Sequence, residues 1–116
     1  MITLRQLITV APFPEETRQE LLSHEDALTS DKKVEVEELC WALISQWYQN
    51  ELRAKQELAT LEMAQGTKQY TVEDFKRMGD EVFIDLVQKL DVQSSEEDLA
   101  EAREKLGALL NEHQNN

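Results

Sequence analysis

The chain has few of the residues with which β-sheet proteins turn and pair. Its 116 residues include three glycines and two prolines, and only 6% of the side chains are aromatic. The β-branched residues do not gather into runs of alternating polarity, so the sequence offers no clear strands. These scarcities argue against sheet-based folds and favour an all-helical chain.

Other absences limit the location of the protein. A single cysteine, Cys40, excludes an intramolecular disulfide. No apolar stretch approaches the roughly 20 residues that a membrane span needs. The first residues also lack the continuous apolar region of a signal peptide. We therefore expect a protein without a membrane span, in the reducing cytoplasm.

Basic residues are scarce as well, because 12 Lys and Arg stand against 24 Asp and Glu, for a net charge of −12. Such a charge keeps a chain soluble and repels nucleic-acid backbones and anionic membranes. The basic residues are scattered, whereas a nucleic-acid binder concentrates them on one face. The composition thus argues against direct binding of DNA or RNA.

No group of residues predicts catalysis, a metal site or a cofactor. Cys40 lies among apolar neighbours, which raise the pKa of a thiol, and no histidine is near it in the sequence. His24 has acidic neighbours, but the second histidine, His113, lies in the tail, and a zinc site needs three or four ligands. Phosphate-binding glycine loops are absent. We expect a protein that is not an enzyme and has no small-molecule substrate.

The whole chain, residues 1–116, is expected to form one elongated bundle of four to five helices. Its main feature is residues 31–65, which contain neither glycine nor proline and predict a single helix about 52 Å long. A compact globule of this size is only about 30 Å across. Three outcomes are therefore open: the helix bends, it makes the molecule elongated, or it extends into a partner. Residues 49–51 are the favoured place for a bend.

The segments before and after the long helix divide the domain into two parts. An N-terminal cluster, residues 1–50, should hold a helix over residues 2–10 and another from Pro14 to about Leu28. Residues 51–112 should combine the distal half of the long helix with an acidic, antiparallel hairpin of two helices, followed by a polar tail, residues 113–116. The predicted caps of the hairpin helices are Thr71 with Asp74, and Ser94 with Glu97.

Both tryptophans and one tyrosine lie between residues 38 and 52. On a helical wheel the apolar residues of this stretch cover an arc of about 160–200°, which is more than one packed neighbour uses. The N-terminal helices can cover the arc, which makes it core. Alternatively Trp41 and Tyr48, at its edge, lie on an exposed strip that binds a partner protein.

Two further surfaces are candidates for partners. The acidic residues Glu96, Glu97 and Asp98 can face a basic partner or imitate a nucleic-acid backbone, or they can simply be solvated. In the long helix, spacings of four, three and four residues predict a coiled-coil-like seam for self-association. Its members are Ala54, Leu58, Leu61 and Gln65.

The sequence therefore predicts a non-enzymatic helical interaction or scaffold protein with a protein partner, and self-association is one form of this hypothesis. The alternative is an acidic inhibitor that blocks a basic nucleic-acid-binding protein. The two differ in salt dependence, because an interface of apolar anchors keeps most of its affinity at about 0.5 M salt and a charge mimic does not.

Overall fold

The computed structural model describes residues 1–114, and the side chains of residues 1–111. The described chain is helical throughout and contains no strand, which confirms the predicted fold class. Five α-helices and one 3-10 turn follow one another. They are α1 (Leu4–Val10), α2 (Glu15–His24), η1 (Glu25–Ala27), α3 (Ser30–Ala64), α4 (Val72–Leu90) and α5 (Glu96–Gln114).

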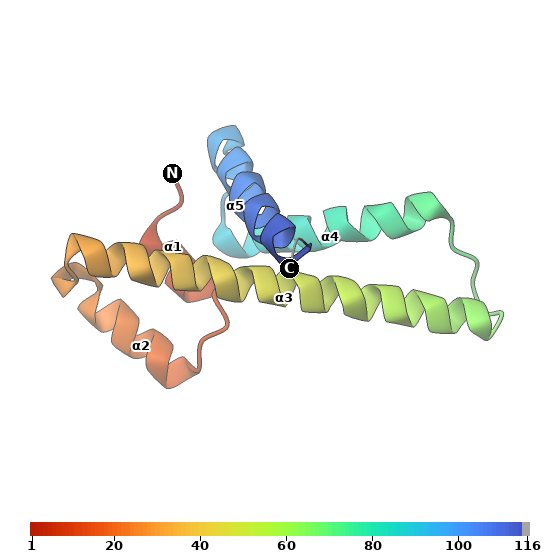
Figure 1. The fold of residues 1–116 in the computed structure, drawn as a ribbon, viewed down its shortest axis with the longest axis horizontal. Helices are drawn as coiled ribbons and strands as arrows, with labels where there is room; N and C mark the ends of the chain where they lie inside the picture. Colours follow the sequence, from red (N-terminus) through yellow and green to blue (C-terminus); the bar gives the residue numbers. More distant parts are fainter. Residues whose placement is uncertain (115–116) are drawn as a thin grey trace.

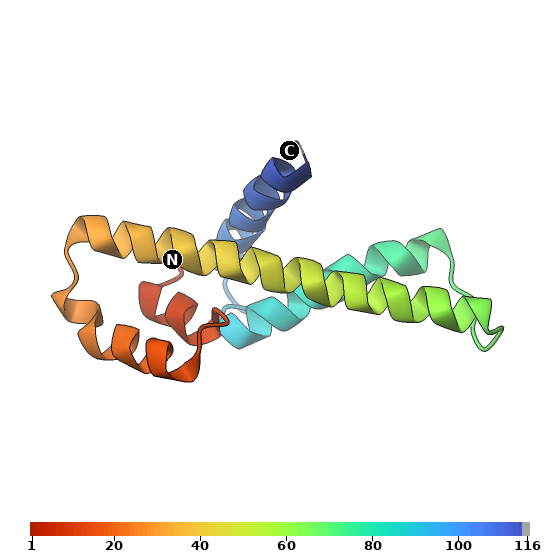
Figure 2. The same ribbon diagram turned by 60° about the horizontal axis from the view of Figure 1, so that its bottom comes forward.

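The predicted long helix is confirmed as α3, which begins and ends within one residue of the predicted bounds. The Thr29 side chain caps it by accepting a hydrogen bond from the Lys32 N–H, and Gly66 ends it with a φ of 74°. Helix α3 runs unbroken through residues 49–51 and spans the molecule from end to end (Figures 1 and 2). The molecule measures 56 × 31 × 31 Å, and its radius of gyration of 16.5 Å exceeds the roughly 13 Å of a compact chain of this length.

The main core lies at the N-terminal half of α3. Helix α1, which Thr3 caps together with Gln6, packs against α2, α3 and α4. Helix α2 is shorter than predicted, because the chain tightens into η1 after His24. The largest fully buried side chains of this core come from α1, α3 and α4, and α5 adds the smaller Ala102. The largest include Leu7, Ile8, Cys40, Ile44, Leu86 and Leu90.

Helix α4 runs back along α3 in the opposite direction (Figure 1). The predicted cap is present, because Thr71 and Asp74 exchange side-chain to backbone hydrogen bonds in a capping box. The Tyr70 ring packs on the Phe75 ring just beyond this cap, with ring centroids 6.1 Å apart. The far half of this pair of helices, which we call the distal arm (residues 51–78), extends away from the main core.

The position of α5 differs from the predicted hairpin with α4. Helix α5 packs mainly against α3 and crosses it obliquely, so the antiparallel neighbours are α3 and α4 (Figures 1 and 2). The chain turns at Asp91, which adopts the left-handed conformation with φ 59° and ψ 45°. Ser95 rather than Ser94 caps α5, because its hydroxyl accepts a hydrogen bond from the Asp98 N–H.

The polar tail predicted for residues 113–116 is partly helical, because α5 continues to Gln114. Residues 115–116 lie outside the described part of the chain. Within residues 1–114, no helix combines the length and the apolar character that crossing a membrane requires.

Candidate partner-binding groove

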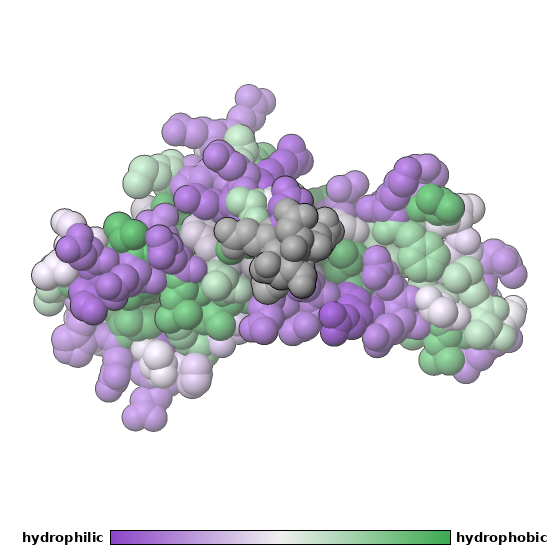
Figure 3. Space-filling model, in the orientation of Figure 1, coloured by the Kyte–Doolittle hydropathy of each residue, from purple (hydrophilic) through white to green (hydrophobic). Residues whose placement is uncertain are grey.

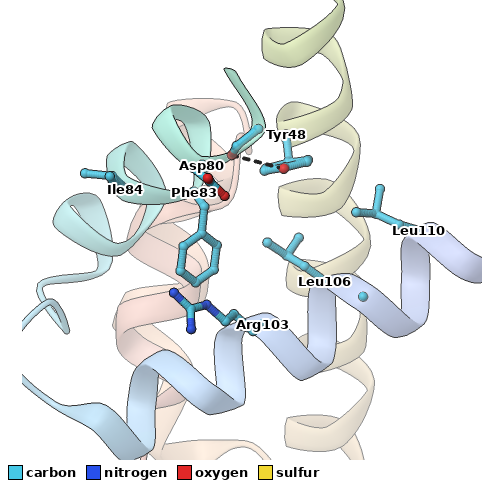
Figure 4. Close-up of a pocket in the computed structure, with 9 residues that line it drawn as sticks. Tyr48, Asp80, Phe83, Ile84, Arg103, Leu106 and Leu110 are labelled. Atoms are coloured by element: carbon cyan, nitrogen blue, oxygen red, sulfur yellow. Dashed lines mark hydrogen bonds between the residues drawn. The ribbon is translucent and has the colours of Figure 1, made fainter. Parts of the chain in front are cut away.

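An open groove of about 450 Å³ lies where α3, α4 and α5 meet (Figure 4). Helix α3 contributes Tyr48, one of the two aromatic residues proposed for partner binding. Helices α4 and α5 form the two walls because α5 crosses α3 beside the middle of α4. The lining residues are Tyr48, Gly79, Asp80, Phe83, Ile84, Arg103, Leu106, Gly107 and Leu110.

Tyr48 is half-buried at the floor of this groove, and its hydroxyl donates a hydrogen bond to the backbone oxygen of Gly79 at 3.1 Å. The close approach of α3 and α4 here favours glycine, because a Cβ at position 79 would lie a tight 3.1 Å from the Tyr48 oxygen. Burial, and secondarily the charge of Asp80, raise the pKa of Tyr48. The phenol is therefore a neutral donor that joins two helices and is poorly suited to proton transfer.

The walls of the groove combine apolar side chains with one cation and one carboxylate, Arg103 and Asp80. The Arg103 guanidinium lies over the Phe83 ring, 5.1 Å from its centroid, a geometry that favours a cation–π interaction. Leu106 and Leu110 project from α5 on the same side (Figure 4). Ile84 points outward from α4 and is 51% exposed. The groove thus offers apolar side chains at its floor and at its edge.

The surroundings of the groove are acidic. Asp80 lines it directly. Glu96 lies seven residues before Arg103 on α5, a spacing that places both on the same face of the helix. Residues 80–111 carry nine acidic residues and three basic ones. The acidic ones are Asp80, Glu81, Asp85, Asp91, Glu96, Glu97, Asp98, Glu101 and Glu104, and the basic ones are Lys89, Arg103 and Lys105.

Trp41, the other proposed aromatic anchor, is not part of this groove. It is 3% exposed and belongs to the main core, so its indole offers no surface to a partner in this conformation. Its Nε1–H has no hydrogen-bond partner among the described protein groups. Trp47 is half-buried against the same core, with the Lys89 ammonium 4.5 Å from its ring centroid. The core interpretation thus applies to Trp41, whereas Tyr48 lines this groove.

The three acidic residues at the start of α5 have different surroundings. Asp98 forms an ion pair with the α-amino group of Met1 at 2.6 Å and is largely covered, and Glu101 accepts a hydrogen bond from the Ile2 N–H at 3.0 Å. Glu96 and Glu97 are exposed. The ion pair raises the pKa of the Met1 amine. One of the three predicted partner-binding acids therefore has an internal structural partner that the sequence did not reveal.

The other reactive side chains are separate from the groove. Burial, with a smaller contribution from Glu37, raises the pKa of the Cys40 thiol to about 11. His24 is exposed, and its Nδ1 lies 2.9 Å from the Glu20 backbone oxygen. Among the residues that the structure describes, no three His, Cys, Asp or Glu side chains are placed to hold a metal ion together.

Comparison of the chain with protein-family models, with curated protein sequences and with solved structures finds no match. A proposal for function therefore rests on the shape and the charge of the groove.

Proposed function

We propose that the protein is a non-enzymatic interaction protein whose groove binds an amphipathic helix with basic flanks, supplied by another protein. The observation that carries this proposal is the combination of an apolar groove with a half-exposed isoleucine, Ile84, at its edge and carboxylates around it. Helix-in-groove recognition uses such surfaces, with apolar residues of the ligand at spacings of three and four. A cytoplasmic location, where Cys40 stays a free thiol, suits this role.

The apolar part of the groove supplies affinity. Tyr48 and Phe83 already have restricted side chains, so they bury area on binding at little further cost in entropy. Covering the exposed half of Ile84 contributes about 1 kcal/mol, which is half of the roughly 2 kcal/mol for burying a whole isoleucine side chain. Several contacts of this size are needed, because association itself costs at least about 4 kcal/mol.

The charge of the groove selects the partner. Asp80 at the groove and Glu96 on the same face of α5 as Arg103 repel acidic ligands and attract basic ones. Such charges mainly raise the association rate and suppress wrong partners, while the apolar contacts slow dissociation. A second copy of this chain is a poor occupant for the groove, because residues 80–111 are strongly acidic in both copies.

The test uses a synthetic helical peptide with leucines on one face and lysines on the other, titrated into isotopically labelled protein. The three glycines give separate amide NMR signals that report on different places. Gly79 and Gly107 line the groove and should shift on binding, whereas Gly66, at the end of the distal arm, should not. A leucine–glutamate peptide of the same register is the control and should not bind.

Matched variants identify the contact. Ile84→Ser should weaken binding of the leucine–lysine peptide about tenfold, whereas Leu39→Ser, at an equally exposed position of α3 outside the groove, should not. Binding that survives about 0.5 M salt and depends on Ile84 supports the proposal. Binding that disappears at that salt concentration and is unchanged by Ile84→Ser contradicts the proposed groove function. That result supports the nucleic-acid mimic instead.

A further inference from the structure

The distal arm has few buried side chains. Its buried side chains are Ala59 and Met78, and neither belongs to the main core. Two packed helices without a third layer bury little apolar surface, so an isolated pair of this kind is marginally stable. The space-filling view shows apolar surface at the end of the molecule where the arm lies, at the right of Figure 3.

The seam predicted from the sequence lies open on this arm. Leu58 is 59% exposed and Leu61 is 52% exposed, and the flanking positions Ala54 and Gln65 are exposed as well. The spacing places the four residues on one face of α3, turned away from the buried Ala59 by more than a quarter of a turn. In coiled-coil order they occupy positions d, a, d and a.

The arm also differs from the remainder of the chain in charge. It carries five basic and five acidic residues and is neutral, so the whole net charge of −12 belongs to the other residues. Two copies therefore meet at the arm without the repulsion that opposes contact elsewhere. The basic residues are Arg53, Lys55, Lys68, Lys76 and Arg77, and the acidic ones are Glu51, Glu57, Glu62, Glu73 and Asp74.

The charged residues beside the seam have partners within the chain. Lys55 forms an ion pair with Glu81 at 3.6 Å. Glu62, whose side chain is 19% exposed, forms an ion pair with Lys68 at 3.4 Å and accepts a hydrogen bond from the Tyr70 hydroxyl. These charges therefore select no orientation for two copies, and the contact depends on the exposed leucines.

From these observations we infer that the protein self-associates through the distal arm, with the Ala54, Leu58, Leu61 and Gln65 faces of two copies packed against each other. The α3 helices of the two copies then form the contact, and the copies are related by a two-fold axis. The seam has only two leucines per chain, so the interface falls at the small end of known interfaces, below about 1,200 Å², and the dimer is weak. This association is independent of the groove and leaves two grooves free on one particle.

Sedimentation velocity of the full chain, from micromolar to millimolar concentration, tests the inference. We expect a monomer that becomes a dimer as the concentration rises. The NMR signal of Gly66 should shift with concentration, and those of Gly79 and Gly107 should not. A monomer at every concentration overturns the inference, and so does a dimer in which the groove glycines shift.

Substitutions in the seam give a second readout. Leu58→Glu should abolish the dimer, whereas Leu39→Glu, at a similarly exposed position near the other end of α3, should leave it intact. Both variants keep the folded circular dichroism spectrum, because both side chains are exposed. Dimerisation that survives Leu58→Glu contradicts the proposed seam.

Discussion

Trp41→Ala is the most informative single change in the core. The indole is 3% exposed, and a buried tryptophan removes about 200 Å² of surface from water, which corresponds to about 5 kcal/mol at 25 cal per Å². The variant also deletes an Nε1–H that has no hydrogen-bond partner among the described protein groups. Removing this buried, unpaired donor offsets about 1–3 kcal/mol of the loss. We therefore expect a net loss of about 2–4 kcal/mol in the free energy of unfolding.

Urea unfolding followed by far-UV circular dichroism measures this loss. Trp47 remains in the variant, so its fluorescence provides a second probe, and coincident transitions confirm two-state behaviour. Trp41→Phe keeps much of the ring area without the orphan N–H, so it should cost less than Trp41→Ala. Leu39→Ala, at a position 50% exposed on the same helix, is the surface control and should cost under about 1 kcal/mol.

A loss for Trp41→Ala no larger than that of Leu39→Ala would refute the assignment of Trp41 to the core. Unchanged stability combined with lost partner binding would restore the exposed-strip interpretation that the sequence left open. A loss of about 2–4 kcal/mol instead means that weaker partner binding by this variant reports unfolding rather than a lost contact.

Two further predictions concern α3 and its neighbours. Gly79→Ala gains up to about 1 kcal/mol of helix propensity, but the new Cβ lies only 3.1 Å from the Tyr48 oxygen. The two effects oppose each other, so this variant alone should leave the free energy of unfolding nearly unchanged. In a Tyr48→Phe background, which lacks that oxygen, it should raise the free energy of unfolding. A double-mutant cycle by thermal unfolding measures this coupling, and additive effects would contradict the contact. The raised pKa of Cys40 predicts slow reaction with a thiol reagent, about 100-fold slower than in the unfolded chain at the same pH from the thiolate fraction alone. The unfolded chain loses the Cys40 thiol proton at a lower pH than the folded chain does. The same pKa shift therefore predicts that the free energy of unfolding, measured by denaturant titration at a series of pH values, falls as the pH rises from 9.0 towards about 11.

The sequence was sufficient for features that depend on neighbouring residues. The length of α3 follows from the absence of helix breakers up to Gly66, and the start of α4 follows from Thr71 and Asp74. These signals are local, and the structure preserves them because no distant contact competes with them.

The direction of α5 was not predictable because distant contacts determine it. The N-terminal residues hold the start of α5 through Asp98 and Glu101, almost 100 positions away in the chain. As a result, the groove wall that contains Arg103 and Leu106 could not be foreseen, although Tyr48 on the floor was singled out. Whether Tyr48 contacts a partner stays a prediction, which the glycine signals of the peptide titration test.

The turn at Asp91 offers a direct test of what directs α5. A non-glycine residue in the left-handed conformation costs about 1–2 kcal/mol, somewhat less for Asp, and a negative charge at the C-terminal end of α4 opposes the helix dipole. Asp91→Gly removes both costs, so it should raise the free energy of unfolding by up to about 1 kcal/mol. Gln88→Gly, on an exposed position within α4, is the matched control and should lower it by about 1 kcal/mol. Equal destabilisation by glycine at the two positions would mean that the left-handed turn at Asp91 does not form, and that the contacts of α5 with α3 alone determine its direction.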